Sequence, residues 1–164
     1  MYIILTNYGY EPLIVATYAV NFNLSFIKKH ANIRIVNNFS EIKKNEYDIL
    51  MVNSEQSWRK WDNDFYDIAF LKFAKSWNIN KFTYAVSLGF NKWNYTKKDD
   101  KIARLLLKNF TGISVREKNS VKLIKKHLGV NFIFVLEPTL LINKEYYLKI
   151  IKNYKNDNYI FTIK

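Results

Sequence analysis

The sequence predicts an α/β protein with a doubly wound, mostly parallel sheet that helices cover on both faces. Stretches typical of strands and of helices alternate along almost all of its 164 residues, which is the pattern of a parallel sheet with helical crossovers. Residues 47–52 form a continuous apolar run, as expected of a central strand that is covered on both sides. Hydrophobic residues make up 49% of the chain, enough to bury the core of one domain.

The first half of the chain shows this alternation in order. It opens with an apolar, β-rich run that the turn residues Asn7, Gly9 and Pro12 end. Residues 13–30 are mixed in signal but suit a buried helix, and 39–45 suit a short helix or turn. The predicted strands of this half cover 2–6, 32–36, 47–52 and 81–87, and the predicted helices cover 13–30, 39–45 and 65–77.

The second half carries clearer helix boundaries. Thr96 is a predicted N-cap, Gly129 ends a helix that presents Val121 and Ile124 on one face, and Asn143 caps another. The final strand follows a helix directly, so it is either an edge strand of this sheet or the first strand of a second domain. The predicted helices of this half cover 97–109, 118–127 and 143–154, and the predicted strands cover 111–115, 132–136 and 158–164.

The composition excludes several kinds of site. The chain has no cysteine, which rules out disulfides, thiolate metal ligands and cysteine nucleophiles. His30 and His127 lie far apart and near predicted helix ends, where a cation is favourable without any ligand. The sequence therefore predicts no metal site and no cofactor.

The net charge and the hydropathy of the sequence indicate which partners and which location to expect. The formal charge of +12 raises affinity for nucleic acid, anionic membranes or phosphorylated substrates, and its sign does not choose among them. The lysines are scattered over polar helix faces, and no known nucleic-acid-binding motif is present, which favours a solvated surface over a specific nucleic-acid site. Neither a membrane span nor a signal peptide is recognisable. We expect a soluble cytoplasmic protein, with the inner face of an anionic membrane as an alternative location.

Polar loops follow four predicted strands at their carboxyl ends. In a doubly wound sheet such ends meet along one edge, where ligands bind. Four separate loops rich in Ser, Glu, Gln, Thr and Arg are not needed merely to turn the chain. The sequence therefore predicts a substrate-binding edge made of Asn53, Ser54, Glu55, Gln56, Trp58, Ser87, Gly89, Arg116, Glu137 and Thr139.

The segment Ser114-Val-Arg-Glu117 marks a change from strand to helix. Ser114 and Glu117 have the spacing of a capping box, which satisfies backbone donors without a ligand. Arg116 then lies at the edge of the sheet beside a helix terminus, a position suited to binding an anion. A local carboxylate is the competing partner for this guanidinium.

Other residues of the predicted edge also have a structural alternative. Gln56 and Glu55 can bond to the backbone of their own loop, and Trp58 is more typical of a core or loop anchor than of a sugar-stacking platform. For Gly89 the structural alternative is a backbone conformation that favours glycine.

The order of these loops resembles the polysaccharide pyruvyl transferase family. Asn53-Ser-Glu-Gln-Ser-Trp58 is similar to the family's Gly-Ser-Asp-Gln-x-Trp loop, and Tyr84-Ala-Val-Ser-Leu-Gly89 to its Tyr-Ala-Ala-Ser-Phe-Gly strand. Ile113-Ser-Val-Arg-Glu117 matches its Ser-x-Arg-Glu element, and Leu136-Glu-Pro-Thr-Leu-Leu141 resembles its Asp-Pro-Thr element. The resemblance covers about residues 47–164. Asn7-Tyr8-Gly9 corresponds best to the family's Asn-Tyr-Gly entry loop.

The resemblance implies a fold, a reaction and a set of partners. The fold is a glycosyltransferase-B-like pair of Rossmann-like domains, of which this chain looks like the amino-terminal half, with one domain over 1–157 and the start of a second at 158–164. The reaction moves pyruvate as a ketal from phosphoenolpyruvate to a sugar of a cell-surface polysaccharide. Arg116 is implied to reach the phosphate or carboxylate of the donor. A carboxyl-terminal half or a homo-oligomer would complete the cleft.

A non-catalytic protein is the alternative hypothesis. Asn53 stands where the family has glycine, and Glu55 and Glu137 are each one methylene longer than the family's aspartates. A truncated or degenerate domain of this kind would bind a glycan or a protein partner without transferring pyruvate.

Overall fold

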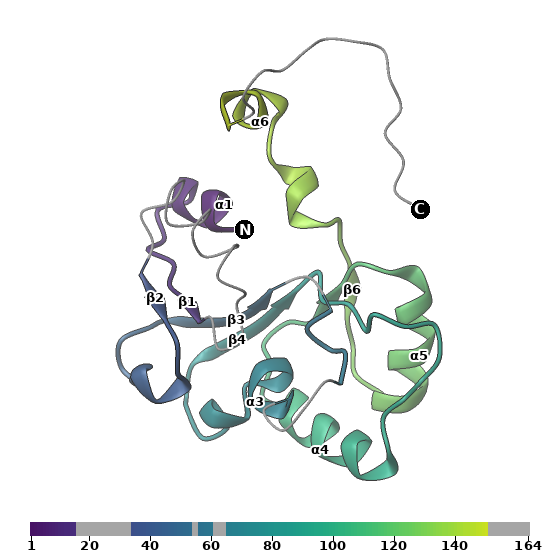
Figure 1. Ribbon diagram of the computed structural model, residues 1–164. Coiled ribbons are helices and arrows are strands. Elements are labelled where there is room, and N and C mark those ends of the chain that lie inside the picture. The colour runs from purple at the N-terminus through teal and green to yellow at the C-terminus, as the bar shows by residue number, and fades with distance from the viewer. Residues whose placement is uncertain (16–33, 54–55, 61–64, 151–164) are drawn as a thin grey trace, which may run out of the picture.

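The computed structural model describes residues 1–15, 34–53, 56–60 and 65–150. It is a mixed α/β structure with small parallel sheets (Figure 1). Helices α3 and α4 lie on one side of the β3–β4 pair, and α1 lies on the other side. The α-helices are α1 (Tyr2–Asn7), α3 (Phe65–Phe70), α4 (Lys97–Leu107), α5 (Lys118–Leu128) and α6 (Lys144–Ile150), and the 3-10 helices are η1 (Phe39–Glu41), η2 (Lys72–Ala74) and η3 (Pro138–Leu141).

All strand pairs among the described residues are parallel, as the alternation of elements predicts. Within the ranges that the structure describes, three two-stranded sheets form, in the orders β1-β2, β3-β4 and β5-β6. Parallel bridges from Phe82 to Gly112 and from Val86 to Val115 place the β4 segment beside the β5 segment. The paired strands are β1 (Ile14–Val15) with β2 (Ile35–Val36), β3 (Ile49–Asn53) with β4 (Asn80–Tyr84), and β5 (Ser114–Val115) with β6 (Ile133–Phe134).

A bulge interrupts the pairing between β4 and β5. From Phe82 to Val86 the chain advances four residues, whereas from Gly112 to Val115 the facing segment advances three. The extra residue is accommodated at Ala85, which has a left-handed φ of 54° and is fully buried. Such a conformation costs a non-glycine residue about 1 kcal/mol or more. Bulges of this kind occur next to functional sites, where they redirect the chain.

The core is built around aromatic side chains beside β4. Trp58, Phe65, Phe70 and Tyr95 are all buried and belong to one hydrophobic cluster. The ring centroids lie 5.4 Å apart for Trp58 and Phe70 and 5.3 Å apart for Phe65 and Tyr95. These separations fall in the favourable range for tilted and edge-to-face aromatic pairs. The cluster fixes the loop that follows β3 against α3.

Local sequence signals place several element boundaries correctly. Thr96 caps α4, because its hydroxyl accepts from the amide of Asp99 while the Asp99 carboxylate accepts from the amide of Thr96. Gly129 ends α5 with a left-handed φ of 63°. Asn143 precedes α6 and accepts from the amide of Tyr146.

The predicted strand at 2–6 is wrong. Residues Tyr2–Asn7 form helix α1 instead, and Gly9 follows it with a φ of 82°. An apolar, β-branched run is stable as a strand only when a neighbouring strand pairs with it. The first strand to pair, β1, begins only at Ile14. The helix satisfies the backbone of 2–7 internally, so no sheet partner is needed.

The predicted helix at 65–77 is interrupted. Helix α3 ends at Phe70, and Leu71 adopts a left-handed φ of 50° before η2 begins. Leu71 is buried in the core, so tertiary packing outweighs the helical spacing of the apolar residues.

Two other predicted elements fall largely or wholly outside the described residues. Of the predicted helix at 13–30, the structure describes only the start, where Ile14–Val15 form β1 instead. The predicted strand at 158–164 and the end of the predicted helix at 143–154 also lie outside.

A buried carboxylate ties α4 to the 56–60 loop and to α3. Asp99 accepts from Lys60 Nζ at 2.7 Å, from Thr96 Oγ1 at 2.8 Å and from the hydroxyl of Tyr66. Burial alone would raise the pKa of Asp99, but these hydrogen bonds outweigh it and hold the pKa well below the ordinary 3.8. Burial, together with the hydrogen bond and charge of Asp99, raises the pKa of Tyr66 to about 12. The network therefore stabilises the fold with Asp99 ionised.

Asp99→Asn is expected to lower the free energy of unfolding by about 2 kcal/mol at neutral pH, because hydrogen bonds to a charged acceptor are lost. A depressed carboxyl pKa stabilises the fold fully above the ordinary value of 3.8 and progressively less as the pH falls through the folded value. The difference in the free energy of unfolding between wild type and variant should therefore be constant above about pH 5 and shrink below about pH 4. Urea unfolding followed by circular dichroism across this range measures it. A difference that does not change with pH would contradict the assignment.

Candidate functional site

The loops after β3, β4, β5 and β6 meet along one edge of the strands. Asn53 at the end of β3 pairs with Tyr84 at the end of β4. Val115 at the end of β5 pairs with Phe134 on β6 and bridges to Val86. Because every pair is parallel, the carboxyl ends lie at the same edge. The structure thus brings together the four loops on which the predicted site depends.

Arg116 is the charged centre of this edge. Its Nη1 donates to Glu137 Oε2, and its Nε donates to Glu117 Oε1 at 3.1 Å. The Ser120 hydroxyl donates to the other oxygen of Glu117 at 3.1 Å, which orients that carboxylate from α5. About a quarter of the Arg116 side chain remains exposed. The guanidinium therefore lies at the surface, held in place by two carboxylates.

The electrostatics keep this arginine charged. Burial would lower the pKa of Arg116, but the hydrogen bonds and charges of Glu137 and Glu117 raise it above its ordinary value. Two carboxylates around one guanidinium leave the cluster with a net negative charge. An anionic ligand at Arg116 therefore meets this negative charge and competes with the two carboxylates for the guanidinium.

Tyr84 ends β4 at the same edge, although the sequence did not point to it as a site residue. The pKa of its phenol is raised, first by burial and second by the negative charge of Glu137. The sequence places Tyr84 inside a predicted strand at 81–87, whereas regular pairing with β3 ends at Tyr84. The bulge after Tyr84 is the only feature that marks this tyrosine as the end of a strand, and it would have to be recognised from the sequence.

Gln56 and Gly89 bring the first two loops into contact. Gly89 has a φ of 68°, and a Cβ there would lie 2.9 Å from Gln56 Cγ, Cδ and Oε1. Gln56 Oε1 also accepts from Arg59 Nη1 at 2.8 Å. Glycine suits the positive φ at 89, and a Cβ there would force the Gln56 side chain to shift.

Trp58 and Ser87 lie beneath these loops. The Trp58 amide donates to the Ser87 carbonyl at 3.1 Å, and its indole Nε1 donates to the Ala69 carbonyl at 3.0 Å. Ser87 Oγ accepts from the Gly89 amide at 2.9 Å. Trp58 is fully buried and Ser87 is almost so. Both side chains therefore support the loops from below, which agrees with the structural alternative for Trp58.

The remaining predicted site residues lie on the exposed parts of these loops. Asn53 and Thr139 are exposed. The carbonyl of Asn53 accepts from Ser57 Oγ at 2.7 Å, and that of Thr139 accepts from Tyr147 Oη at 2.6 Å. Both residues thus lie on the exposed side of the edge. Ser54 and Glu55 lie outside the described residues.

The predicted capping box of Ser114 and Glu117 is wrong. Glu117 is itself the N-cap residue of α5, and no side chain caps this helix. Ser114 is a buried residue of β5 whose hydroxyl donates to the Thr83 carbonyl at 2.8 Å and accepts from the Ala85 amide at 3.1 Å. The hydroxyl therefore holds the bulge at Ala85, directly after β4, where the regular backbone ladder is broken.

Ser114→Ala is expected to lower the free energy of unfolding by about 2–3 kcal/mol, because the Ala85 amide and the Thr83 carbonyl lose a buried partner. Ser120→Ala is the matched control: it is equally buried but donates one hydrogen bond to the half-exposed Glu117, so a loss of about 1 kcal/mol is expected. Urea unfolding monitored by circular dichroism compares the two. A Ser114 variant as stable as the control would exclude this role in the bulge.

Two hollows of the described surface lie away from this edge. One hollow lies at the opposite edge, around the amino ends of β3 and β4, and includes Asp48, Asn80 and Lys81. Lys81 is buried there, and its Nζ donates to the Trp77 carbonyl at 2.7 Å. A second hollow runs along α4. Neither includes residues of the loops around Arg116.

Comparison with protein-family models identifies the chain. Residues 2–164 match the model of the polysaccharide pyruvyl transferase domain. The chain belongs to the polysaccharide pyruvyl transferase family. No curated protein and no solved structure gives a significant match. The resemblance carried by the four loop motifs is thereby confirmed at the level of the family.

The match also extends the domain towards the chain start. The loop motifs begin at residue 47, whereas the polysaccharide pyruvyl transferase model begins at residue 2. The segment Asn7-Tyr8-Gly9, which ends α1, is therefore part of this family's domain. Within the described residues no cluster of three or more His, Asp or Glu is arranged to hold a metal ion. None of the helices described there has the length and hydropathy that crossing a bilayer requires.

Proposed function

We propose that this protein transfers pyruvate as a ketal from phosphoenolpyruvate to a sugar of a cell-surface polysaccharide. The observation that supports this most is Arg116, the charged group at the edge where the four family loops meet. A guanidinium binds carboxylate and phosphate through two parallel hydrogen bonds, and phosphoenolpyruvate carries both groups. Family membership supplies the reaction class.

The reaction balances without a cofactor. The methylene carbon of phosphoenolpyruvate gains a proton, two hydroxyl groups of the sugar bond to the adjacent carbon, and inorganic phosphate leaves. Of the two protons that the hydroxyl groups lose, one is gained by the methylene carbon and the other leaves with the phosphate. Arg116 would hold the donor through its phosphate or carboxylate and offset the charge of the leaving phosphate. The donor would take the place that Glu137 occupies on Nη1.

The surrounding residues have supporting roles in this proposal. Gln56 and Gly89 shape the adjoining loops, and Trp58 and Ser87 hold them from below. Asn53, Ser54, Glu55 and Thr139 would contact the donor or the acceptor sugar. A doubly wound, Rossmann-like arrangement of one domain over 1–157 is part of the proposal, as is a second domain that starts at 158–164 and faces this edge. The parallel pairs β3–β4 and β5–β6 are compatible with it.

Phosphate release from phosphoenolpyruvate tests the proposal. The chain is assayed with an acceptor glycan, alone and mixed with the carboxyl-terminal half of a family member, and mass spectrometry detects the ketal on the glycan. We expect phosphate and ketal in equal amounts. Absence of turnover in both mixtures would reject the transferase activity.

A non-catalytic protein that binds a glycan or a protein partner is the second candidate. It is favoured by one observation: Glu137 and Glu117 already neutralise the arginine that would bind the donor. It predicts that calorimetric titration with phosphoenolpyruvate gives no heat, even for the unmodified chain. The transferase proposal predicts measurable heat.

Gly89→Ala is expected to lower turnover more than tenfold, because its Cβ would push Gln56 away from the edge. Gly129→Ala is the matched control, since Gly129 has a similar φ of 63° but no atom within 4 Å of the added Cβ. Both variants should lose about 1 kcal/mol of stability from the backbone conformation. Phosphate release and urea unfolding are measured on both. Equal turnover in the two variants would show that the Gln56 contact has no functional role.

A further inference from the structure

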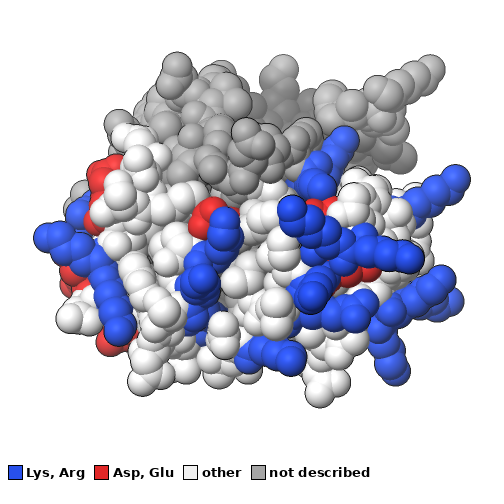
Figure 2. Space-filling view, turned by 90° about the horizontal axis from the view of Figure 1, so that it is seen from below, with Lys and Arg blue, Asp and Glu red and all other residues white. Residues whose placement is uncertain are grey.

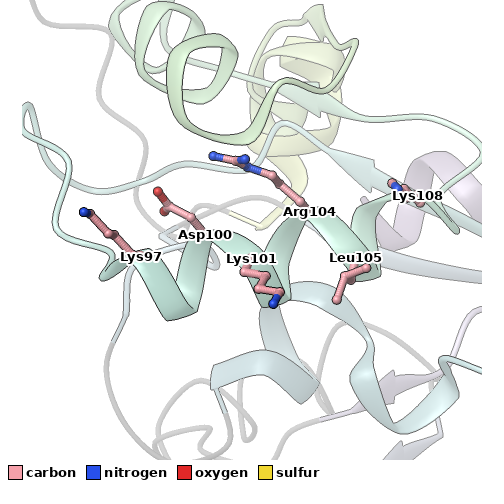
Figure 3. Close-up of a pocket in the computed structure, with 6 residues that line it drawn as sticks. All are labelled: Lys97, Asp100, Lys101, Arg104, Leu105 and Lys108. Carbon is pink, nitrogen blue, oxygen red and sulfur yellow. The ribbon is translucent and has the colours of Figure 1, made fainter.

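The solvent-facing side of α4 carries a row of cations. Lys97, Lys101, Arg104 and Lys108 are spaced four, three and four residues apart, so they lie along one side of the helix. All four are exposed, and Leu105 among them is 56% exposed. Figure 3 shows these side chains around a shallow hollow of the surface. We call this surface the α4 basic face.

The acidic residue of the hollow does not neutralise this face. The Asp100 carboxylate accepts from Trp93 Nε1 at 2.8 Å and lies 3.6 Å from His127 Nδ1. Arg104 Nε donates to the His127 carbonyl at 2.8 Å. Asp100 and Arg104 thus lie at the border of this face that is turned towards α5, whereas Lys101 and Leu105 lie at its border away from α5 (Figure 3). The lysines keep their charge at the surface.

Neighbouring charges extend the positive field of this face. Helix α5 packs beside α4 through the Arg104–His127 contact. Figure 2 shows Lys and Arg side chains across the side of the molecule that bears α4, most densely where α4 and α5 lie. With a formal charge of +12, the chain attracts polyanionic surfaces before any contact forms. The exposed lysines of α5 are Lys118, Lys122, Lys125 and Lys126.

We propose that the α4 basic face docks the folded protein on an anionic lipid bilayer. A plane of lipid phosphates needs charge without fixed geometry, and lysine ammonium groups supply this. Leu105 is placed among them so that its side chain can enter the boundary between headgroups and acyl chains. A single-stranded nucleic-acid groove would instead use aromatic stacking platforms, and neither an aromatic residue nor a fully free arginine lines the hollow. This property is independent of pyruvyl transfer.

Sedimentation of the full chain with lipid vesicles tests the proposal. The vesicles contain phosphatidylcholine alone or mixed with phosphatidylglycerol, at an ionic strength of about 0.1 M, where charges interact over about 10 Å. We expect binding only to the anionic vesicles. Replacing Lys101 and Lys108 together by glutamine should lower the partition coefficient about 25-fold, because each cation near the surface contributes about fivefold. Leu105→Ser should lower it about fivefold.

The matched control replaces Lys144 and Lys149 by glutamine. Both are exposed residues of α6, at the far end of the molecule from α4 (Figure 1), and the change in net charge is the same. We expect this control to lower the partition coefficient less than about twofold, because its charges lie at the opposite end of the molecule from the docked face and salt screens them from the bilayer. Circular dichroism confirms that all variants are folded. Equal losses in the two double variants, or binding to phosphatidylcholine alone, would overturn the proposal. Binding to duplex DNA of equal strength, with the same dependence on Lys101 and Lys108, would also overturn it, since the face would then be a general polyanion site.

Discussion

Replacing Arg116 by alanine is expected to eliminate the heat of phosphoenolpyruvate binding and to lower turnover at least a hundredfold. In the proposed function Arg116 binds the donor through two charge-assisted hydrogen bonds, each worth about 1.5–3 kcal/mol, and the substitution removes both. It also leaves Glu137 and Glu117 without their common cation, so the edge repels an anionic donor. Calorimetric titration measures binding, and phosphate release measures turnover.

Two further variants distinguish three effects of Arg116: its planar guanidinium group, its local positive charge, and its contribution to the net charge of the chain. Arg116→Lys keeps the cation but loses the planar fork, so we expect binding about tenfold weaker rather than none. Arg34→Ala removes an exposed arginine just before β2 and should leave the heat unchanged. If Arg116→Ala binds the donor as well as the Arg34 control does, Arg116 is not the donor-binding residue. If the unmodified chain gives no heat, the non-catalytic alternative is favoured instead.

The parts of the fold that the sequence predicts well are those set by local signals. The Thr96 cap and the Gly129 end of α5 depend on residues within one helical turn. The parallel pairing of β3 with β4 follows from an apolar run and its crossover helix. In contrast, residues 2–6 have strand composition, but they form α1 and pair with no strand of the described part of the chain. Composition alone does not reveal the absence of a partner.

The candidate site divides in the same way. That four loops meet at one edge was predictable, because parallel strands with polar residues after their carboxyl ends imply it. The role of Ser114 was not predictable from the sequence. It depends on one extra residue in the β4 segment relative to the β5 segment, and only the register of the two segments shows that residue. The sequence left two alternatives for the partner of Arg116, a ligand or a local carboxylate. The structure shows the carboxylates of Glu137 and Glu117 beside it. The binding roles of the site residues stay predictions.

Replacing Trp58 by alanine is expected to lower the free energy of unfolding by about 3–5 kcal/mol, the range for removing a large aromatic side chain from a core. Trp58 is fully buried, its ring lies against Phe70, and its indole donates to the Ala69 carbonyl. Many domains have a total stability of only about 5–15 kcal/mol, so the variant should be close to unfolding at physiological temperature. Urea unfolding followed by far-ultraviolet circular dichroism measures the loss.

Trp58→Phe distinguishes support of the loop from contact with a ligand. Phenylalanine keeps an aromatic ring in the core but leaves the Ala69 carbonyl without the indole donor, which should cost about 1–3 kcal/mol. Because the Trp58 backbone would still bond to Ser87, the loops should keep their places, and donor binding should change less than about threefold. A Phe variant that is stable but binds donor more than tenfold more weakly would mean that the indole itself reaches the ligand. That result would require the Trp58 side chain to become exposed, because in the structure the buried ring has no surface to offer a sugar or a phosphate.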